Sequence, residues 1–353
     1  ITGTVTVDGT LTIGSNAALA VELRGGELKI GKNGKVDLTK CPLNIDADSK
    51  LVIDAEGMGV GEYTKLIGSV VNNGTIEVIN NNLVAEIVDG KVFLKKKPVA
   101  SVDGVEYADL ISALKAIKAN SVVEILSDVT INEKWDVRNT GAKITVPVTI
   151  NGNGHTIAFN GVVNDGYNYY SAFRFEAAAT VTDLTIDMTN AKSEFQGRFR
   201  AISAKSDLTV DGCTFIGNGS ANNTRAIIFG EGAGDAIGNV VITITDSTFT
   251  GWRQGVSDNE QGKQEVKSVT ITGNTFTDAG VNVSAAETIN FNNNTVEGRW
   301  VKLVCYVSEN LTVNAQGNTL TADGADSNIA KGATLNVQDE FLPPVAEVNG
   351  VAY

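Results

Sequence analysis

The sequence is poor in the residues that build metal and redox sites. It has a single histidine, His155, and three cysteines, Cys41, Cys213 and Cys305, which lie far apart in unrelated contexts. One histidine cannot supply a histidine-based metal cluster, and an odd number of scattered cysteines suits neither a disulfide framework nor a CxxC metal site. We therefore expect small buried or turn thiols, no metal and no cofactor.

Long apolar runs and basic stripes are also lacking. No apolar run reaches the roughly eighteen residues that a membrane-spanning helix needs, so the sequence predicts no membrane span. The net charge is −13, with acids and bases mixed along the chain. The one basic stretch, "FLKKKPV", is short and lies beside a proline, which favours a solvated linker. Because nucleic acids require a basic stripe to neutralise phosphates, we expect no nucleic acid partner.

Glycine is abundant instead, with 37 residues against five prolines, which is typical of short strands joined by tight turns. In residues 1–97, alternating apolar positions and Gly/Asn/Asp turns recur, as in "TLTIGSN", "ELKIGKNGKVDL" and "PLNIDADSKLVID". Treating Ile13, Ile30 and Ile45 as equivalent gives a period of 15–17 residues. Strands and turns at a fixed period predict a β-solenoid.

Residues 107–119, "YADLISALKAIKA", follow a helical period instead. Asp109 is a suitable N-cap, and five apolar side chains fall on one face of the helix. These are Tyr107, Leu110, Ile111, Leu114 and Ile117. The first coil of a solenoid has an open edge that must be covered. We therefore predict that this helix caps a second solenoid and buries Leu110, Ile111 and Leu114.

After the helix, seven variants of one phrase follow: a strand, a turn of Gly, Asn or Asp, and a second strand, as in "LTVDGCTFIG" and "VTITGNTFTDAG". The first inward residues are predicted to be Ile150, Ile186, Val210, Ile244, Ile271, Phe291 and Val313. Six of the seven variants have a second inward residue, namely Ile157, Phe215, Phe249, Phe276, Val296 and Leu320. Stacked turns would also place Asn274 over Asn294, where amides can form a hydrogen-bonded ladder.

The phrase "VTITGNTF", its variants and the first coil "NGNGHTI" resemble the right-handed parallel β-helix superfamily, which is pectate-lyase-like in shape. The stretch "VDGVEYADLISALKAIKANSVVEILSDVTI" is similar to the module opening of large repeat-bearing surface proteins of anaerobic gut bacteria. The resemblance covers roughly 100–340 and implies an extracellular place on a bacterial cell surface. The expected fold class is all-β: a right-handed parallel β-helix with one short N-terminal capping helix, preceded by a second, shorter β-solenoid segment.

The final residues "PPVAEVNGVAY" match "PVASVDGVEYADL" near residue 98. Pro98 and Pro344 begin these two stretches, so we predict one module over 98–343, with the capping helix at 107–119. We predict that 1–97 is the tail of a preceding module and that 344–353 is the truncated start of a next one. Neighbouring repeat modules of the same chain are therefore expected partners.

The resemblance also raises the possibility of catalysis, because β-helices of this shape often degrade or bind polysaccharides along a groove. Pectin hydrolases of the superfamily carry "NTD", "DD", "GHG" and "RIK", and this sequence has none of them. A Ca²⁺-dependent lyase needs an acidic cluster. Asp246, Asp258, Glu260 and Glu265 are candidates, although "SDNEQGKQE" is also typical of a solvated loop. We predict no catalytic residue, and a polysaccharide-degrading lyase or glycoside hydrolase stays open as the alternative.

Aromatic residues collect outside the coil pattern, in "NDGYNYY", "GWRQG" and "EGRW". Aromatic faces stack on apolar sugar surfaces, while Asn, Asp and Arg bond to hydroxyls. The candidate ligand-binding residues are Tyr167, Tyr169, Tyr170, Trp252, Arg253 and Trp300. Trp252 and Trp300 follow their coils at comparable offsets, which predicts that they line one face; packing over the outer strands is the alternative.

The leading hypothesis is therefore a non-catalytic, adhesin-like surface module whose partner is a polysaccharide or a host or cell-surface glycan. A plain spacer without a ligand is the third hypothesis.

Overall fold

A computed structural model describes residues 1–12, 20–163, 171–193, 198–219, 224–230, 239–258, 266–283, 286–303, 312–321, 325–326, 334–341, 347–348 and 351–352. The chain divides into two compact units, Ile1–Lys97 and Pro98–Tyr353. It is mostly β-structure and contains a β-solenoid of about 10 turns, which confirms the expected fold class. Within the described residues, no helix is long and apolar enough to cross a membrane.

The first unit is a short solenoid with two parallel sheets. One sheet has the strand order β1 (Thr4–Val7), β4 (Glu27–Ile30), β6 (Lys50–Asp54) and β9 (Thr75–Ile79). In the other sheet, β5 (Lys35–Ile45) pairs with β2 (Thr10–Thr12), β3 (Val21–Leu23) and β8 (Leu66–Asn72). Because side chains alternate between the faces of a strand, one face of every coil contributes to a single apolar core.

The coil period of the first unit is longer than predicted. Val7, Ile30, Ile53 and Val78 stack in register, in steps of 23, 23 and 25 residues. Ile45 lies in β5, where it pairs with Leu23 and Asn72, so it is not equivalent to Ile30. The expected equivalence is wrong because consecutive strand–turn phrases belong to different sheets of one coil. Ile13 lies outside the described residues.

An antiparallel hairpin closes the last coil of the first unit. β10 (Leu83–Val88) pairs with β11 (Lys91–Lys96), which also pairs with β7 (Gly61–Glu62). Val92 and Leu94 are buried in the solenoid core, and Leu83, Ala85 and Ile87 pack against it. The hairpin therefore covers the apolar end of the stack, as an open solenoid end requires.

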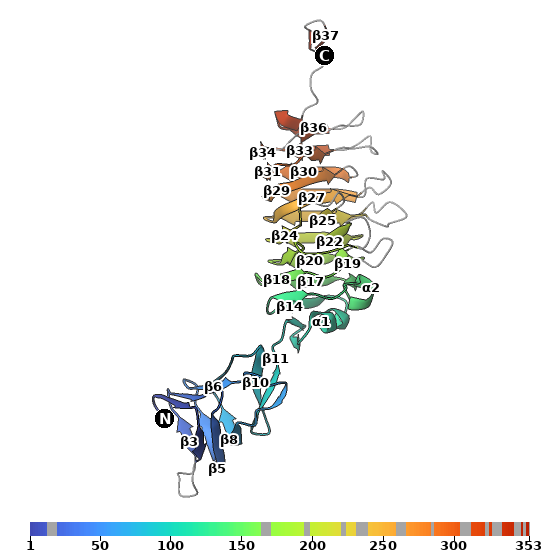
Figure 1. Ribbon diagram of the computed structural model, residues 1–353. Coiled ribbons are helices and arrows are strands. Elements are labelled where there is room, and N and C mark those ends of the chain that lie inside the picture. Colours follow the sequence, from blue (N-terminus) through green and yellow to red (C-terminus); the bar gives the residue numbers. More distant parts are fainter. Residues whose placement is uncertain are drawn as a thin grey trace. The chain divides into compact units, whose positions relative to one another are not determined.

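The second unit is a parallel β-helix of stacked coils (Figure 1). Strand pairing arranges its strands in three ladders. The first ladder contains β14 (Ser121–Ile125), β17 (Val148–Asn151), β20 (Ala179–Thr182), β23 (Leu208–Asp211), β26 (Val241–Thr245), β28 (Val266–Thr272), β30 (Ala286–Asn292), β33 (Thr312–Ala315) and β36 (Thr334–Val337). The second contains β15 (Val129–Ile131), β18 (Thr156–Phe159), β21 (Thr185–Asp187), β24 (Thr214–Ile216), β27 (Thr248–Asp258), β29 (Thr275–Val283), β31 (Thr295–Glu297) and β34 (Thr319–Thr321).

The third ladder contains β16 (Lys143–Ile144), β19 (Ser171–Phe175), β22 (Phe199–Ala204), β25 (Thr224–Phe229), β32 (Val301–Leu303) and β35 (Ala325–Asp326). The long strands β27 and β29 pair with members of both the second and the third ladder. They therefore join the two ladders into one bent sheet.

The register confirms the second set of inward residues and completes it. Ile157 lies opposite Ile186, and Ile186 lies opposite Phe215, so Ile186 belongs to the second ladder. Its predicted place in the first ladder is wrong, because Val181 pairs with both Ile150 and Val210 there. The strand "ATVT" of this coil lacks the large apolar residues of its neighbours, which hid it in the sequence.

Each coil contributes an equivalent residue to columns that run along the stack. The rings of Phe215, Phe249 and Phe276 stack in parallel, with centroids 5.0 and 4.7 Å apart. These distances match the usual separation of neighbouring strands. The predicted amide ladder is confirmed as well: the Asn274 side-chain Nδ2 donates to Asn294 Oδ1 at 3.1 Å, and Asn294 Nδ2 donates to Asn318 Oδ1 at 3.1 Å.

The start of the β-helix is covered by a hairpin and a helix. β12 (Ala100–Val102) pairs with β13 (Val105–Tyr107) and with β14. Helix α1 (Leu110–Ala116) begins at its N-cap Asp109, whose side chain accepts from the Ser112 amide at 2.8 Å. A second helix, α2 (Val137–Thr140), is only four residues long.

Helix α1 is shorter than the expected range 107–119, and it buries a different face from the one predicted. Leu110 and Leu114 are buried, as predicted, but Ile111 is 37% exposed and Ala113 fills the core position instead. The expectation for Ile111 is wrong, because the face of the helix that packs on the core consists of Leu110, Ala113 and Leu114.

Replacing Leu114 by alanine is expected to lower the free energy of unfolding of the second unit by about 2 kcal/mol, the low end for a buried leucine at the edge of a core. The measurement is urea unfolding followed by tryptophan fluorescence. All three tryptophans lie after residue 97, so the signal reports the second unit alone. Ile111→Ala is the control, expected to change stability by less than about 0.5 kcal/mol. Equal effects of the two substitutions would contradict the assigned face of the helix.

The C-terminal part holds η1 (Asp339–Phe341) and an antiparallel pair, β37 (Glu347–Val348) with β38 (Val351–Ala352). Val348 lies opposite Val351, as Val102 lies opposite Val105 in the hairpin at the start of the unit. In that first hairpin, Asp103 and Gly104 have φ angles of 51° and 82°, as a two-residue type I′ turn requires. That residues 344–353 open a further module, and that 1–97 end a preceding one, stay predictions.

Candidate functional site

The third ladder carries a column of six aligned residues on the side of its strands away from the core; five are polar, and all but Lys302 are buried. Strand register aligns Arg174, Ser203, Ile228, Ser257, Asn282 and Lys302, from β19 to β32. The neighbours of Ser203 in its strand, Ile202 and Ala204, belong to the buried core. Since successive side chains point to opposite faces of a strand, the aligned residues face away from the core. We call these six residues the outer column.

A second line of polar residues runs beside the outer column. Arg200 pairs with Arg225, Arg225 with Gln254, and Gln254 lies opposite Gly280. The Nε of Arg225 donates to Gln254 Oε1, and a guanidinium nitrogen of Arg200 donates to the carbonyl of Phe199 at 3.2 Å. The Arg225–Gln254 bond joins successive coils, whereas the Arg200 bond stays within β22.

Three hydroxyls of the third ladder are buried without a hydrogen bond to the protein. They are the Oγ atoms of Ser171, Ser203 and Ser257, and each residue is at most 1% exposed. A buried polar group normally has a partner, because leaving it unbonded costs about 1–3 kcal/mol. These hydroxyls are closed off from the surface, so an external ligand does not reach them in this structure.

An accessible aromatic side chain lies at one end of this face. Trp300 is partly exposed, and a Cβ on Gly280 would lie 3.6 Å from its Cδ2, an ordinary van der Waals distance, so the indole lies beside β29. The Lys302 ammonium is 5.8 Å from the ring centroid, within cation–π range. Arg253 is exposed, and its carbonyl oxygen lies 2.9 Å from the same Cβ position. We call Arg253, Gly280, Trp300 and Lys302 the Trp300 patch.

The structure places the backbones of two predicted ligand-binding residues, Arg253 and Trp300, beside Gly280, and separates the Trp252 side chain from them. The Trp252 ring is fully buried: its Nε1 donates to the Phe215 carbonyl at 3.1 Å, and its edge meets the Phe199 ring at 5.8 Å. The expectation that both tryptophans line one face is wrong, because Trp252 packs in the core. The predicted Tyr167, Tyr169 and Tyr170 lie outside the described residues.

Two carboxylates stand near the ends of third-ladder strands, Glu176 after β19 and Asp258 at the end of β27. Phe175 is aligned with Asp258 through Ala204 and Phe229, three strand separations away. Three separations amount to about 14 Å. Glycosidases use carboxyl groups roughly 5–9.5 Å apart. This pair therefore lacks the spacing for that reaction.

The surroundings of Glu176 are also unsuited to a general acid. Its carboxylate lies 3.0 Å from Arg174, 3.3 Å from Lys143 and 3.8 Å from Lys205. Burial raises the pKa of Glu176, but hydrogen bonds from Arg174 and Lys143 outweigh burial and hold the pKa below its usual value. Burial and the Arg174 charge lower the pKa of Lys205. Three cations around one ionised carboxylate make this end of the face basic, whereas a general acid must stay protonated.

The acidic residues considered for Ca²⁺ do not come together. Asp246 lies in the turn between β26 and β27, whereas Asp258 ends β27 on the third ladder. Glu260 and Glu265 lie outside the described residues. In the part of the chain that the structure describes, no three His, Cys, Asp or Glu side chains gather as metal ligands.

His155 and the cysteines have structural surroundings. His155 Nδ1 lies 3.2 Å from Asp128 Oδ1 in a turn of the first coils. Cys41 and Cys213 are buried thiols, as predicted, and burial raises the pKa of Cys213 to about 11. Cys305 lies outside the described residues.

Sequence reasoning missed the third ladder, which carries the outer column. Its strands, such as "SAFRF" in β19 and "FRAISA" in β22, lie between the recognised phrases. In these strands apolar residues alternate with Arg or Ser, and one such strand occurs in each coil. That recurrence of a polar residue inside a buried strand is the signal that could have revealed them.

No family model and no curated protein sequence matches the chain. The geometry of the outer column and the Trp300 patch is therefore the ground for a functional argument.

Proposed function

We propose that the chain is a non-catalytic, adhesin-like repeat module of a bacterial cell-surface protein, and that it binds a polysaccharide or a host or cell-surface glycan at the Trp300 patch. The observation that carries the proposal is the partly exposed Trp300 ring beside Gly280, with the Lys302 ammonium 5.8 Å from its centroid and the Arg253 carbonyl also beside Gly280. The ring offers a stacking surface to a sugar, and the Lys302 ammonium offers hydrogen-bond donors to its hydroxyl or carboxyl groups.

The rest of the third ladder supports the same proposal. The buried Asn282, Ser257 and Ser203 precede Lys302 in the outer column and belong to the scaffold beneath the patch, not to its exposed surface. The patch stands on stacked strands whose positions are fixed by the core, as is typical of recognition surfaces on rigid scaffolds. A single aromatic contact binds a sugar weakly, and repeated modules would raise the avidity.

The test is binding of the chain to an array of plant, microbial and mucin glycans, followed by titration of the best ligand. Trp300→Ala is expected to weaken binding about tenfold, about 1.4 kcal/mol, the upper range for one aromatic contact. Lys267→Ala is the control, because Lys267 is exposed on the first ladder and pairs with a neighbouring surface glutamate, Glu287.

Equal binding by the Trp300 variant and the parent would contradict the assignment of the Trp300 patch as the binding site. Release of reducing sugars or unsaturated products from the bound polysaccharide would overturn the non-catalytic assignment. The surface location is tested separately, by whether the complete coding sequence carries a secretion signal and a cell-surface anchor.

A further inference from the structure

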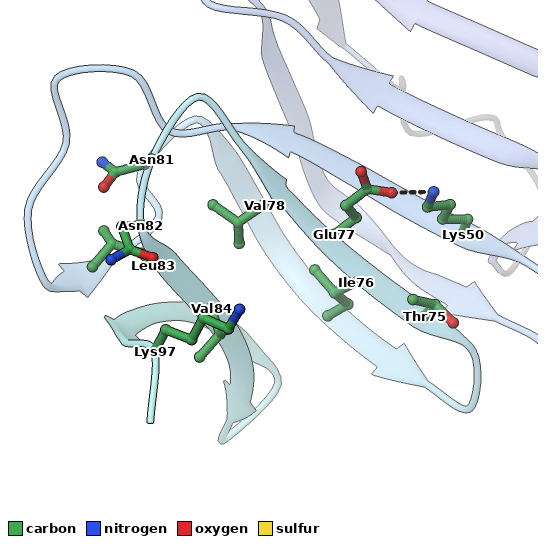
Figure 2. Close-up of a pocket in the computed structure, with 10 residues that line it drawn as sticks. All are labelled: Lys50, Thr75, Ile76, Glu77, Val78, Asn81, Asn82, Leu83, Val84 and Lys97. Atoms are coloured by element: carbon green, nitrogen blue, oxygen red, sulfur yellow. Dashed lines mark ion pairs between the residues drawn. The ribbon is translucent and has the colours of Figure 1, made fainter. Parts of the chain in front are cut away.

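The end of the first solenoid contains an open groove between two strand edges. The groove has a volume of about 420 Å³ and is lined by Ile76 and Val78 of β9, by Leu83 and Val84 of β10, and by Lys50 and Lys97 (Figure 2). The turn at Asn80–Asn82 joins the two strands. The groove lies wholly within the first unit, far along the sequence from the Trp300 patch.

Both strands are edge strands toward the groove. In the described structure β9 pairs only with β6, and β10 pairs only with β11. The Thr75 amide donates to the Ser49 carbonyl at 3.0 Å, and the Ile79 carbonyl accepts from the Ala55 amide at 3.1 Å. Odd-numbered residues of β9 therefore bond toward β6. Because successive residues of a parallel strand direct their amide and carbonyl groups to opposite edges, Ile76 and Val78 direct theirs away from β6.

The groove admits one strand, whereas a whole coil is excluded. A complete coil would have to pack on the apolar end of the stack, which the β10–β11 hairpin already covers with Val92 and Leu94. The hairpin leaves the β9 edge itself uncovered, together with the partly buried Ile76 and Val78 side chains. An extended segment can use such an edge through main-chain hydrogen bonds and place alternate side chains on the apolar lining.

Lysines stand at both ends of the groove, but Lys50, opposite Thr75 at the start of β9, is paired with Glu77. Lys96 lies opposite Leu83, so Lys97 follows at the end of the groove where β9 passes into the turn. Lys97 is exposed, and the preceding Lys96 is exposed as well. Parallel addition to β9 brings the C-terminal end of the segment to this basic end. An acidic residue or a carboxylate there is therefore favoured.

We infer that the β9 edge binds an extended peptide segment of another protein by parallel strand addition. The segment has apolar side chains at alternate positions and an acidic C-terminal end. This inference concerns a second surface and does not depend on glycan binding.

The probe is a labelled, capped peptide with the sequence SKLVIDA, residues 49–55 of the chain itself. In the chain this sequence pairs in parallel with the other edge of β9, with Leu51 opposite Ile76 and Ile53 opposite Val78, and Asp54 supplies the acidic end. We expect saturable binding to the full chain. Two isomers of the peptide, N-methylated on alternate sets of amides, are expected to differ at least tenfold in affinity, because only one set faces β9.

Val78→Pro removes the amide that points into the groove and keeps the bonds to β6, so it is expected to weaken binding at least tenfold. Val78→Thr is the matched control, since it keeps the amide and the branched side chain and is expected to bind within about twofold. Circular dichroism of both variants checks that the unit is folded. No saturable binding, or equal binding of the two N-methylated isomers, overturns the inference. Self-association of the chain that the peptide displaces would make a second copy the occupant, and would overturn the assignment to another protein.

Discussion

Phe249→Ala is expected to lower the free energy of unfolding of the second unit by about 3–5 kcal/mol. The Phe249 ring is fully buried and stacks in parallel on Phe215 at 5.0 Å and on Phe276 at 4.7 Å. Alanine removes both ring contacts and leaves a cavity between strands whose backbones are locked by cross-coil pairing. The cavity cannot collapse, which places the cost at the upper part of the range for core truncations.

Urea unfolding followed by tryptophan fluorescence measures this loss, because every tryptophan belongs to the second unit. Thr250→Ala is the matched control: it is the next residue of the same strand, exposed on the opposite face, and is expected to change stability by less than about 0.5 kcal/mol. Amide hydrogen exchange would add a local readout, since coils contact mainly their neighbours and the opening should centre on β24, β27 and β29. A loss below about 1 kcal/mol would contradict the stacked core.

The fold could be predicted from the sequence because the columns of the β-helix have strong local signals. Large apolar residues at Phe215, Phe249 and Phe276 recur just after Gly, Asn or Asp turns, and the structure stacks them as expected. The amide ladder was predictable for the same reason, since Asn274 and Asn294 occupy one place in the repeated phrase. In such repeats, a residue's place in the repeated phrase predicts its place in every coil.

The parts that could not be predicted depend on contacts between distant residues. The phrase containing Ile186 looks like a first strand in isolation, and only its pairing with Ile157 and Phe215 assigns it to the second ladder. The sequence neighbours of Trp252 are polar or glycine, which suggests an exposed segment. Its burial depends on contacts with Phe199 and with the Phe215 carbonyl from earlier coils. Local composition carries no information about such neighbours.

The candidate site was accordingly predicted only in part. Arg253 and Trp300 were found through the surplus of aromatic and charged residues between coils, and the structure places them on either side of Gly280. The outer column was missed, because its members lie one per coil, inside strands that look like ordinary core segments. Register is needed to see that Ser203 and Ser257 belong to one column.

The amide ladder gives the second large expected effect: Asn294→Ala should lower the free energy of unfolding by about 2–5 kcal/mol. The Asn294 side chain is buried and fully bonded. Its Oδ1 accepts from the Asn274 amide at 3.0 Å and from the Asn274 side chain, and its Nδ2 donates to the Ile271 carbonyl at 2.9 Å and to Asn318. Alanine leaves the Asn274 amide and the Ile271 carbonyl buried without that partner, and each such group costs about 1–3 kcal/mol.

Two variants separate lost hydrogen bonds from lost volume in this prediction. Asn294→Ser is expected to recover part of the stability, because Ser247 occupies the same column and its hydroxyl accepts from the Cys213 amide at 3.0 Å. Asn290→Ala is the matched control on the outer face, where water can replace its bonds to Thr270 and Asn314, and should cost less than about 1 kcal/mol. Equal losses for Asn294→Ala and Asn290→Ala would show that the buried ladder adds nothing beyond a surface contact. If the buried hydrogen bonds stabilise the fold, the free energy of unfolding rises from alanine to serine to asparagine at position 294.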